Sequence, residues 1–251
     1  MTIKNGGIMK LTIAQFSIGP DIGANKDKIL SVLQSAGRNE WIIFPEGALS
    51  GYFPEKDSYF EELDGAELTN TMNEIADEVK RCGCYCLYGS ATYGDEGWLN
   101  SVVIENHSGQ RQLYHKIELS ALDRRHFKPG REIPVYRLDG VTFGVQMCRE
   151  LIFPEAWRSL KKQGAQVVFH INNALNDHDQ IWRSISIARA VENANFVCSV
   201  NNGAFGQKLS SHVVSPSGKV ILETEPSQEQ TISVDVELSE VIDNLANRRD
   251  Y

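Results

Sequence analysis

The order of hydrophobic and polar residues predicts strands and helices that alternate along the chain. Short apolar runs of strand length occupy residues 10–16, 41–44, 85–90, 141–147, 166–171 and 196–200. Between them, apolar residues recur every three or four positions, as on one face of an amphipathic helix, over residues 25–36, 68–79, 154–163 and 179–194. This alternation predicts a layered α/β fold in which helices cover the faces of sheets.

Hairpin signals indicate that these sheets are mixed. Residues 98–104 have a strand pattern, and Pro216-Ser217-Gly218 separates two further strand-like runs at residues 211–215 and 219–223. No stretch has the composition of a linker between domains. We therefore expect one domain over residues 10–251, preceded by a disordered start or cloning remnant at residues 1–9.

Composition and charge exclude several functional classes. The 251 residues include 25 Lys and Arg against 33 Asp and Glu, which gives a net charge of −8. Binding to nucleic-acid backbones and to anionic membranes needs a basic surface, so neither partner is expected. No apolar run is long enough to span a bilayer, and the first residues do not have the apolar stretch of a signal peptide. Five cysteines, an odd number, favour a reducing cytoplasmic compartment.

Cys148 has the position most suggestive of chemistry. It follows the alternating strand at residues 141–147 and precedes the helix predicted from Pro154, so it lies in a strand-to-helix turn. Such a turn holds a nucleophile rigidly and leaves backbone N–H groups free to receive an oxyanion. Position alone is weak support, because most free cysteines are small buried hydrophobic residues.

A thiol that attacks an amide needs a base, and the tripeptide Phe-Pro-Glu supplies three candidates. Glu46 directly follows the buried-looking strand at residues 41–44, where desolvation would make its carboxylate a better base. Glu55 lies in an aromatic loop, and Glu155 lies in a first helical turn, where it complements the helix dipole. Lys116 has apolar neighbours and is, on this ground alone, a surface lysine. By residue type and position, Glu46 is the first candidate for the base, but these features do not show which residues come together in one site.

Four blocks together resemble the nitrilase superfamily of carbon–nitrogen hydrolases, in the family's order, over residues 10–249. Glu46 precedes Lys116 by 70 residues, and Lys116 precedes Cys148 by 32 residues. The blocks are FPEGALSGY at 44–52, YHKIEL at 114–119, GVQMCRELIFPE at 144–155, and RAVEN at 189–193 followed by Asn201 and Gly203.

The resemblance assigns roles by position. It implies that Glu46 is the general base, Lys116 the cation that stabilises the oxyanion, and Cys148 the nucleophile, with the backbone N–H of Arg149 as a second oxyanion donor. It also implies a four-layer αββα sandwich, a ping-pong reaction through a thioester, and assembly into homodimers or larger oligomers. No cofactor or metal is implied, because thiol, carboxylate and amine supply every role.

Two positions depart from the family's pattern. Asp123 stands where many members carry a further active-site glutamate, four residues before Phe127 of a Phe-x-Pro-Gly segment. One methylene shorter, it would reach less far toward Lys116. Arg149 and Glu150 stand where an aromatic residue and an aspartate are common. We expect this charged pair at the pocket mouth, where it favours a polar or charged substrate or forms a surface salt bridge.

Two other groups have simpler interpretations. Cys82, Cys84 and Cys86 look like a metal cluster, but alternate residues on a strand lie about 7 Å apart. Zinc thiolates each bind one shared ion at about 2.3 Å, so we expect core packing and no metal site. The six histidines do not have ligand spacing, and we expect His170 to be a hydrogen-bonded core or pocket residue.

The predicted function is hydrolysis of small linear amides or N-carbamoyl compounds. Substrate specificity is expected in loops 51–59 and 173–180, which contain the candidate pocket residues Tyr52 and Asn173. The apolar residues of segments 179–194 and 238–251 suit a dimer interface.

Three alternatives remain open. The first is a true nitrilase, and the second is a catalytically silent binding protein on the same fold. The third is a protease that pairs Cys148 with His170, although it leaves Glu46, Lys116 and the order of the blocks unexplained.

Overall fold

The strands form two six-stranded sheets. In this computed structural model, which describes residues 7–56, 58–174 and 179–241, the first sheet has the order β12-β1-β2-β3-β4-β5 and the second the order β11-β10-β9-β8-β7-β6. The strands of the first sheet are β1 (Ile8–Gln15), β2 (Trp41–Ile43), β3 (Tyr85–Gly94), β4 (Gly97–Asn106), β5 (Arg111–His115) and β12 (Gln230–Glu237). Those of the second are β6 (Val135–Leu138), β7 (Val141–Met147), β8 (Val167–Ile171), β9 (Phe196–Val200), β10 (His212–Val214) and β11 (Val220–Glu223).

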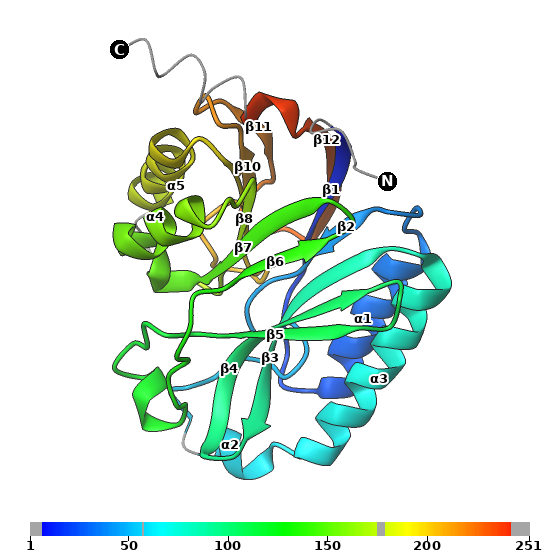
Figure 1. The fold of residues 1–251 in the computed structure, drawn as a ribbon. Coiled ribbons are helices and arrows are strands. Elements are labelled where there is room, and N and C mark those ends of the chain that lie inside the picture. The colour runs from blue at the N-terminus through cyan, green and yellow to red at the C-terminus, as the bar shows by residue number, and fades with distance from the viewer. Residues whose placement is uncertain (1–6, 57, 175–178, 242–251) are drawn as a thin grey trace.

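Helices cover the outer face of each sheet, which confirms the predicted αββα layering. Helices α1 (Ile22–Gln34) and α3 (Gly65–Cys82) pack on the first sheet, and α4 (Pro154–Lys162) and α5 (Asp179–Asn193) pack on the second (Figure 1). The remaining helical elements are short: α2 (Tyr59–Glu62) and the 3-10 turns η1 (Asp123–Arg125) and η2 (Cys148–Ile152).

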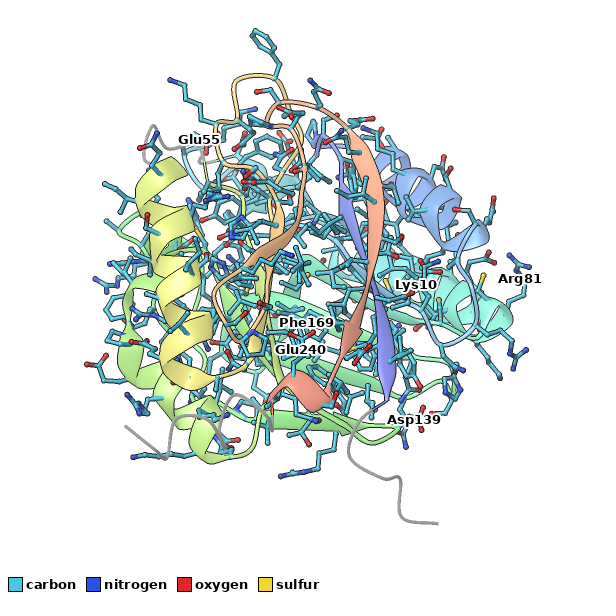
Figure 2. All side chains as sticks on the ribbon, turned by 90° about the horizontal axis from the view of Figure 1, so that it is seen from above. Lys10, Glu55, Arg81, Asp139, Phe169 and Glu240 are labelled. Carbon is cyan, nitrogen blue, oxygen red and sulfur yellow. The ribbon has the colours of Figure 1, made fainter. Side chains whose placement is uncertain are left out.

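A continuous apolar core holds the two sheets together. Trp41 of β2 stacks on Tyr85 of β3, with ring centroids 4.3 Å apart, and reaches Phe143 and Phe169 of the opposite sheet at 5.1 and 5.7 Å. Phe169 lies in the middle of the molecule (Figure 2). Buried aromatic pairs of this kind stabilise the fold beyond their apolar area.

Each sheet has three parallel strands, and their carboxyl ends meet at one edge. Strands β1, β2 and β3 are parallel in the first sheet, and β7, β8 and β9 in the second. Glu46 follows β2 and Cys148 follows β7 directly, while the N–H of Glu46 donates to the carbonyl of Asn172, after β8, at 3.2 Å. The carboxyl ends of parallel strands are where α/β folds form their sites.

Several boundaries differ from the sequence predictions. Helix α1 begins three residues before the predicted Asn25, because the carboxylate of Asp21 accepts the N–H of Ala24 at 2.8 Å and caps it. Strand β1 begins at Ile8, so Ile8 and Met9 pair with β12 rather than belong to a disordered start. The two strands, from opposite ends of the chain, lie side by side (Figure 1). The hairpins β3–β4 and β10–β11 are confirmed. Strands β5, β6 and β12 had no predicted counterpart.

Candidate active site

Glu46 is held at the end of β2 by an unusually close approach of β3. The backbone of Gly89 packs so tightly that a Cβ there would lie 2.3 Å from the nitrogen of Gly47 and 2.6 Å from the Cα of Glu46. Only glycine fits this contact. The side chain of Glu46 is fully buried, whereas Glu55 and Glu155 are exposed (Figure 2 labels Glu55). The expected desolvation of the Glu46 carboxylate is therefore confirmed, and its role as the base stays a prediction.

Lys116 joins two carboxylates in the interior. Its Nζ donates to Oε1 of Glu46 at 2.9 Å and to Oδ2 of Asp123 at 2.9 Å, and it is 1% exposed. Burial alone would lower the pKa of Lys116, but the two carboxylates raise it above its ordinary value. The interpretation as a surface lysine is wrong, because these partners come from segments 70 residues before and seven residues after it. The ammonium stays charged across the physiological range.

Asp123 reaches Lys116 despite its shorter side chain. Burial opposes its ionisation, but Lys116, the hydroxyl of Tyr52 and the N–H of Ser120 together lower the pKa of the Asp123 carboxyl. Tyr52 donates to Oδ1 of Asp123 at 2.5 Å, and its ring lies 5.6 Å from the Lys116 ammonium. Tyr52 thus belongs to this cluster.

Asn100 and Asn173 complete the shell around Glu46. The Asn100 amide donates to Oε1 of Glu46 at 2.8 Å, and the backbone N–H of Asn173 donates to Oε2 at 3.2 Å. The side-chain oxygen of Asn173 instead accepts bonds from Asn202 and Gln207, at 3.0 and 3.1 Å. Asn173 therefore contacts the cluster through its backbone.

Cys148 lies on a strained turn directly after β7. Its φ of +46° is in the left-handed region, which residues other than glycine seldom adopt. The chain continues into the 3-10 turn η2, so the predicted strand-to-helix turn is confirmed. Backbone strain of this kind persists only where the surroundings determine it, and it is concentrated at functional sites.

The electrostatics of Cys148 link it to the charged cluster. Burial raises the pKa of its thiol to about 12, and the charges of Glu46 and Asp123 act in the same direction. Lys116 and a hydrogen bond from the N–H of Arg149 oppose the rise. The resting thiol is therefore protonated at neutral pH, and its use as a nucleophile requires a base that removes the proton.

Glu150 is not at a pocket mouth, contrary to the sequence expectation. It is 1% exposed, and its carboxylate accepts four hydrogen bonds, from the N–H groups of Met147, Ile117 and Glu118 at 2.7, 2.7 and 3.1 Å and from the hydroxyl of Tyr114 at 2.8 Å. Burial raises its pKa, and these donors oppose the rise. Glu150 thus ties the nucleophile turn to the segment that carries Lys116.

Arg149 is half-buried and its side chain is engaged. Nη1 donates to the carbonyl of Leu119 at 2.6 Å, and the guanidinium lies 5.5 Å from the ring of Phe153. Its backbone N–H hydrogen-bonds the Cys148 thiol. No surface salt bridge to Glu150 forms, so that part of the expectation is wrong.

His170 is fully buried, as expected for a hydrogen-bonded core residue. Its Nε2 lies 2.8 Å from the carbonyl oxygen of Cys148, and burial lowers its pKa to about 3. The ring is therefore neutral, and the nitrogen that faces Cys148 bonds the backbone. This geometry argues against a Cys–His protease.

The cysteine trio does not share one strand. Cys82 ends α3, Cys84 precedes β3 and Cys86 lies within β3, while Cys84 and Cys86 are fully buried. Core packing is confirmed for these two, and Cys82 is partly exposed. In the described part of the chain, no three His, Cys, Asp or Glu side chains are placed to hold a metal ion.

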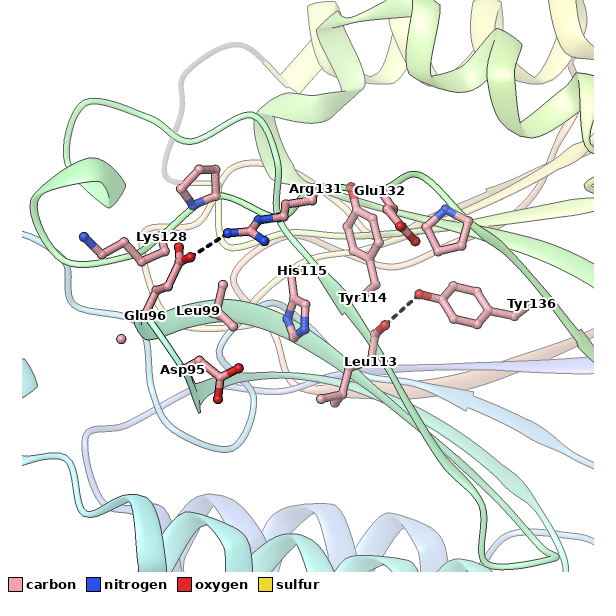
Figure 3. A pocket seen from close by; sticks show the side chains of 14 residues that line it. Asp95, Glu96, Leu99, Leu113, Tyr114, His115, Lys128, Arg131, Glu132 and Tyr136 are labelled. Carbon is pink, nitrogen blue, oxygen red and sulfur yellow. Dashed lines mark hydrogen bonds and ion pairs between the residues drawn. The ribbon is translucent and has the colours of Figure 1, made fainter.

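A separate pocket of about 370 Å³ lies along the edge strand β5 (Figure 3). Leu99, Leu113, His115 and Tyr136 line it, and Arg131 closes one side through an ion pair with Glu96 at 2.6 Å. The residues that line this pocket do not include Glu46, Lys116, Asp123 or Cys148. We therefore do not place the chemistry there.

Sequence reasoning missed Asn100, Asn172 and Gly89. Asn100 lies in the interior of β4 and is 2% exposed, and a buried asparagine in a strand is a signal, because strands are depleted of this residue. Gly89 inside β3 is a comparable signal for a close backbone approach. Asn172, 0% exposed, stands at the end of the apolar run of β8.

Comparisons with known proteins match almost the whole chain. The chain is 27% identical to a probable nitrilase of Schizosaccharomyces pombe, over 92% of this chain and 90% of that protein. It is 28% identical to an (R)-stereoselective amidase of a Pseudomonas species, over 97% of this chain and 89% of that protein. A solved CN-hydrolase superfamily protein of Xanthomonas campestris has the same fold, with a TM-score of 0.85 at 22% identity, over 96% of this chain and 95% of that one.

Within the described residues, no helix has the length and apolarity needed to cross a membrane. Residues 10–243 match the family model described as carbon-nitrogen hydrolase, and the chain therefore belongs to the carbon–nitrogen hydrolase family of the nitrilase superfamily.

Proposed function

We propose that this protein hydrolyses C–N bonds in small linear amides or N-carbamoyl compounds through a thioester on Cys148. One observation carries the proposal: the buried Glu46–Lys116–Asp123 cluster lies beside a cysteine on a strained turn. Burying charged side chains costs free energy, so such a cluster persists only where ion pairing or a functional requirement offsets that cost. Here the charges act on Cys148, which lies at a strand-to-helix turn and whose thiol interacts with the backbone N–H of Arg149.

The first half-reaction acylates the cysteine. Glu46 takes the thiol proton, and Sγ attacks the carbonyl carbon of the substrate. The ammonium of Lys116 and the N–H of Arg149 receive the charge that develops on the oxygen. Glu46 then delivers the proton to the leaving nitrogen, the C–N bond breaks, and ammonia or an amine departs. A thioester remains on Cys148.

The second half-reaction releases the acid. Glu46 takes a proton from water, and the hydroxide attacks the thioester carbonyl. The C–S bond breaks, and the proton returns to the thiolate. Because the same carboxylate serves both half-reactions, its position between Lys116 and Asn100 determines the rate of each.

Asp123 supports the ammonium rather than moving protons. Its contact at 2.9 Å keeps Lys116 charged even when Glu46 is transiently protonated, since one carboxylate then still faces the lysine. The hydroxyl of Tyr52 and the N–H of Ser120 in turn stabilise the Asp123 carboxylate as an anion. We propose that this role replaces that of the family's longer glutamate.

Nitrile hydrolysis is the second candidate, because one relative is named a probable nitrilase. The amidase assignment is favoured by the relative named an (R)-stereoselective amidase. A screen decides between them: purified protein is incubated with small amides, N-carbamoyl compounds and nitriles, and released ammonia and acid are measured by mass spectrometry. Cys148→Ala is the matched control. Turnover of nitriles alone would reject the amidase proposal, and no Cys148-dependent turnover would indicate a silent binding protein.

We also propose a homodimer or larger assembly in a reducing, cytoplasmic compartment. On α5, Ile181 is 56% and Val191 37% exposed, and Ile152 beside α4 is 46% exposed, and these apolar side chains are candidates for contact with a second copy. All five cysteines are free. Most of the predicted interface segment 238–251 lies outside the described residues. Light scattering at micromolar concentration tests the assembly, and a monomeric mass would reject it.

A further inference from the structure

His170 contacts the residue of the nucleophile through a single, well-defined hydrogen bond. Its Nε2 is 2.8 Å from the carbonyl oxygen of Cys148. Because a carbonyl oxygen only accepts, Nε2 carries the proton and Nδ1 is an acceptor. Nδ1 faces the Asn172 amide at 3.2 Å and the Ser199 hydroxyl at 3.1 Å, which supply the donors. The tautomer of His170 is thus fixed by its neighbours.

The carbonyl that His170 holds belongs to the same peptide group as the N–H of Arg149. No described peptide bond is cis, and in a planar trans peptide the C=O and N–H point in opposite directions. The N–H of Arg149 interacts with the Cys148 thiol and lowers its pKa. Fixing the oxygen from one side therefore aims the N–H at the other side.

We propose that His170 is a positioning residue. Its hydrogen bond to the carbonyl oxygen of Cys148 orients the Arg149 N–H of the same peptide group as an oxyanion donor. The inference rests on the proposed function, in which that N–H receives the developing charge. His170 takes no proton from the thiol and touches no substrate.

Because the backbone at Cys148 is strained, a hydrogen bond is needed to hold the peptide group that follows it. With φ at +46°, Cys148 occupies a conformation that relaxes unless neighbouring groups hold it. A rotation of the peptide after Cys148 would turn the N–H away from the thiol. Glu150 secures the peptide group between Gln146 and Met147 by accepting the N–H of Met147 at 2.7 Å, and His170 secures the peptide group between Cys148 and Arg149.

The end of β8 also contacts Glu46, so the same segment positions both the proposed base and the oxyanion donor. The carbonyl of Asn172 accepts the N–H of Glu46 at 3.2 Å, and the N–H of Asn173 donates to the carboxylate of Glu46 at 3.2 Å. The imidazole is packed between Trp157 and Trp182, with ring centroids 5.9 and 6.2 Å away. One rigid strand end thereby fixes both the base and the oxyanion donor.

His212 offers a matched control. It is also fully buried, and both histidines pair in register with Ser199, from β8 and β10. Its Nδ1 lies 3.3 Å from the carbonyl of Ser210, and no hydrogen bond links it to Cys148. Substituting His212 therefore disturbs the core to a similar degree without releasing the nucleophile turn.

The test compares His170→Gln, His170→Asn and His212→Asn with wild type. The amide nitrogen of glutamine lies near the position of Nε2 and keeps the donor, whereas that of asparagine lies near Nδ1 and loses it. Two quantities are measured: kcat and KM on an amide found in the screen, and the pH profile of Cys148 alkylation by iodoacetamide. Thermal melting confirms that each variant is folded.

We expect His170→Asn to lower kcat about tenfold or more with little change in KM, because a misdirected donor no longer stabilises the transition state. Its alkylation profile should move to higher pH, because the thiolate loses the Arg149 hydrogen bond. His170→Gln should restore most of both, and His212→Asn should change neither.

Three results would overturn the inference: wild-type kcat and alkylation in His170→Asn, an equal fall in His212→Asn, or no recovery in His170→Gln. If wild type hydrolyses no amide, the proposed function fails and the alkylation profile alone decides. An unchanged profile in His170→Asn then rejects the role of His170, and an upward shift supports it.

Discussion

The two sheets supply different kinds of chemistry to the same edge. The first sheet contributes charge: Glu46, Lys116 and Asp123 are all buried and lie in direct ionic contact. The second sheet contributes a thiol on a strained turn, where the neutral ring of His170 bonds the backbone carbonyl of Cys148 and the Asn172 amide in turn contacts His170. The nucleophile itself carries no charge at rest, since its pKa is about 12.

This difference shows two ways of holding a reactive group in position: ion pairing on the charged side and hydrogen bonding of a strained turn on the thiol side. Buried charges stabilise one another only as a set, so removal of one partner leaves another uncompensated. The strained turn is held by hydrogen bonds to Glu150 and His170, and neither side chain belongs to the Glu46–Lys116–Asp123 ion-pair cluster. Variants on the charged side should therefore affect stability and rate together, whereas variants on the thiol side should separate the two.

The largest effect is expected from Cys148→Ala. Without the thiol no covalent intermediate forms, and turnover should fall by about 10⁴-fold or more, as for other nucleophile deletions. The fold should remain, because a small residue also fits the partly exposed position. Turnover and thermal melting measure the two quantities.

Cys82→Ala is the matched control, since Cys82 is also partly exposed but ends α3. It should leave turnover near that of wild type. Loss of activity in Cys82→Ala, or retained activity in Cys148→Ala, would show that Cys148 is not the nucleophile.

Lys116→Met should reduce both rate and stability. The oxyanion loses a donor, which costs about 10²–10³ in kcat. The free energy of unfolding should fall by about 3–5 kcal/mol, because two buried carboxylates lose their shared cation. Urea unfolding and steady-state kinetics measure these effects.

A second substitution separates the two effects. Adding Asp123→Asn to Lys116→Met removes one of the uncompensated carboxylates, so part of the stability should return while the rate stays low. If the double variant is less stable than Lys116→Met alone, the charged cluster is not the source of the loss.

Glu150→Gln should mainly destabilise. The amide keeps one acceptor but places an NH₂ group against donors such as the Met147 and Ile117 N–H groups, which costs about 1–3 kcal/mol in unfolding free energy. Chemical denaturation measures the change. Glu155→Gln, at an exposed glutamate five residues away, should change stability by no more than about 0.5 kcal/mol.

A dependence of stability on pH is also expected. Burial lowers the pKa of His170 to about 3 and of His212 to about 4, below the ordinary value of 6.5. As pH falls, the unfolded chain binds protons at these positions before the folded chain does. Their contribution to stability is therefore complete above about pH 6.5 and is lost as pH falls toward 4 and 3.

Urea midpoints at pH 5 and pH 7.5 test this sign. The midpoint should be lower at pH 5, and His212→Asn should reduce the difference. A higher midpoint at pH 5, or an undiminished difference in the variant, would contradict the assignment of buried neutral histidines.

The alternation of strands and helices followed from local apolar patterns, whereas the members of the cluster were indicated only by the resemblance of the four blocks to a family. Apolar periodicity indicated β2, β7 and β8, and the order of the blocks indicated Glu46, Lys116 and Cys148. Strands β5 and β6 are short edge strands at the outer ends of the sheets, and their patterns are weak.

The structural role of Glu150 could not be predicted, because its burial depends on donors more than 30 residues earlier in the chain. A charged residue after a turn is usually exposed, so the residue type predicted exposure of Glu150 instead of burial. His170 was placed in the core, but its contact with Cys148 depends on the β7–β8 register, which residue type does not specify.

The most direct test of the central claim, that Glu46 is the base for a thiol on Cys148, is intact-mass spectrometry of Glu46→Gln during turnover. The substitution is nearly isosteric, and hydrolysis of the thioester loses its base. We expect almost no turnover and accumulation of an acyl adduct that peptide mapping places on Cys148, while Asp123→Asn retains more activity and accumulates less adduct. Near wild-type turnover in Glu46→Gln, an adduct on another cysteine, or greater damage in Asp123→Asn would contradict the account.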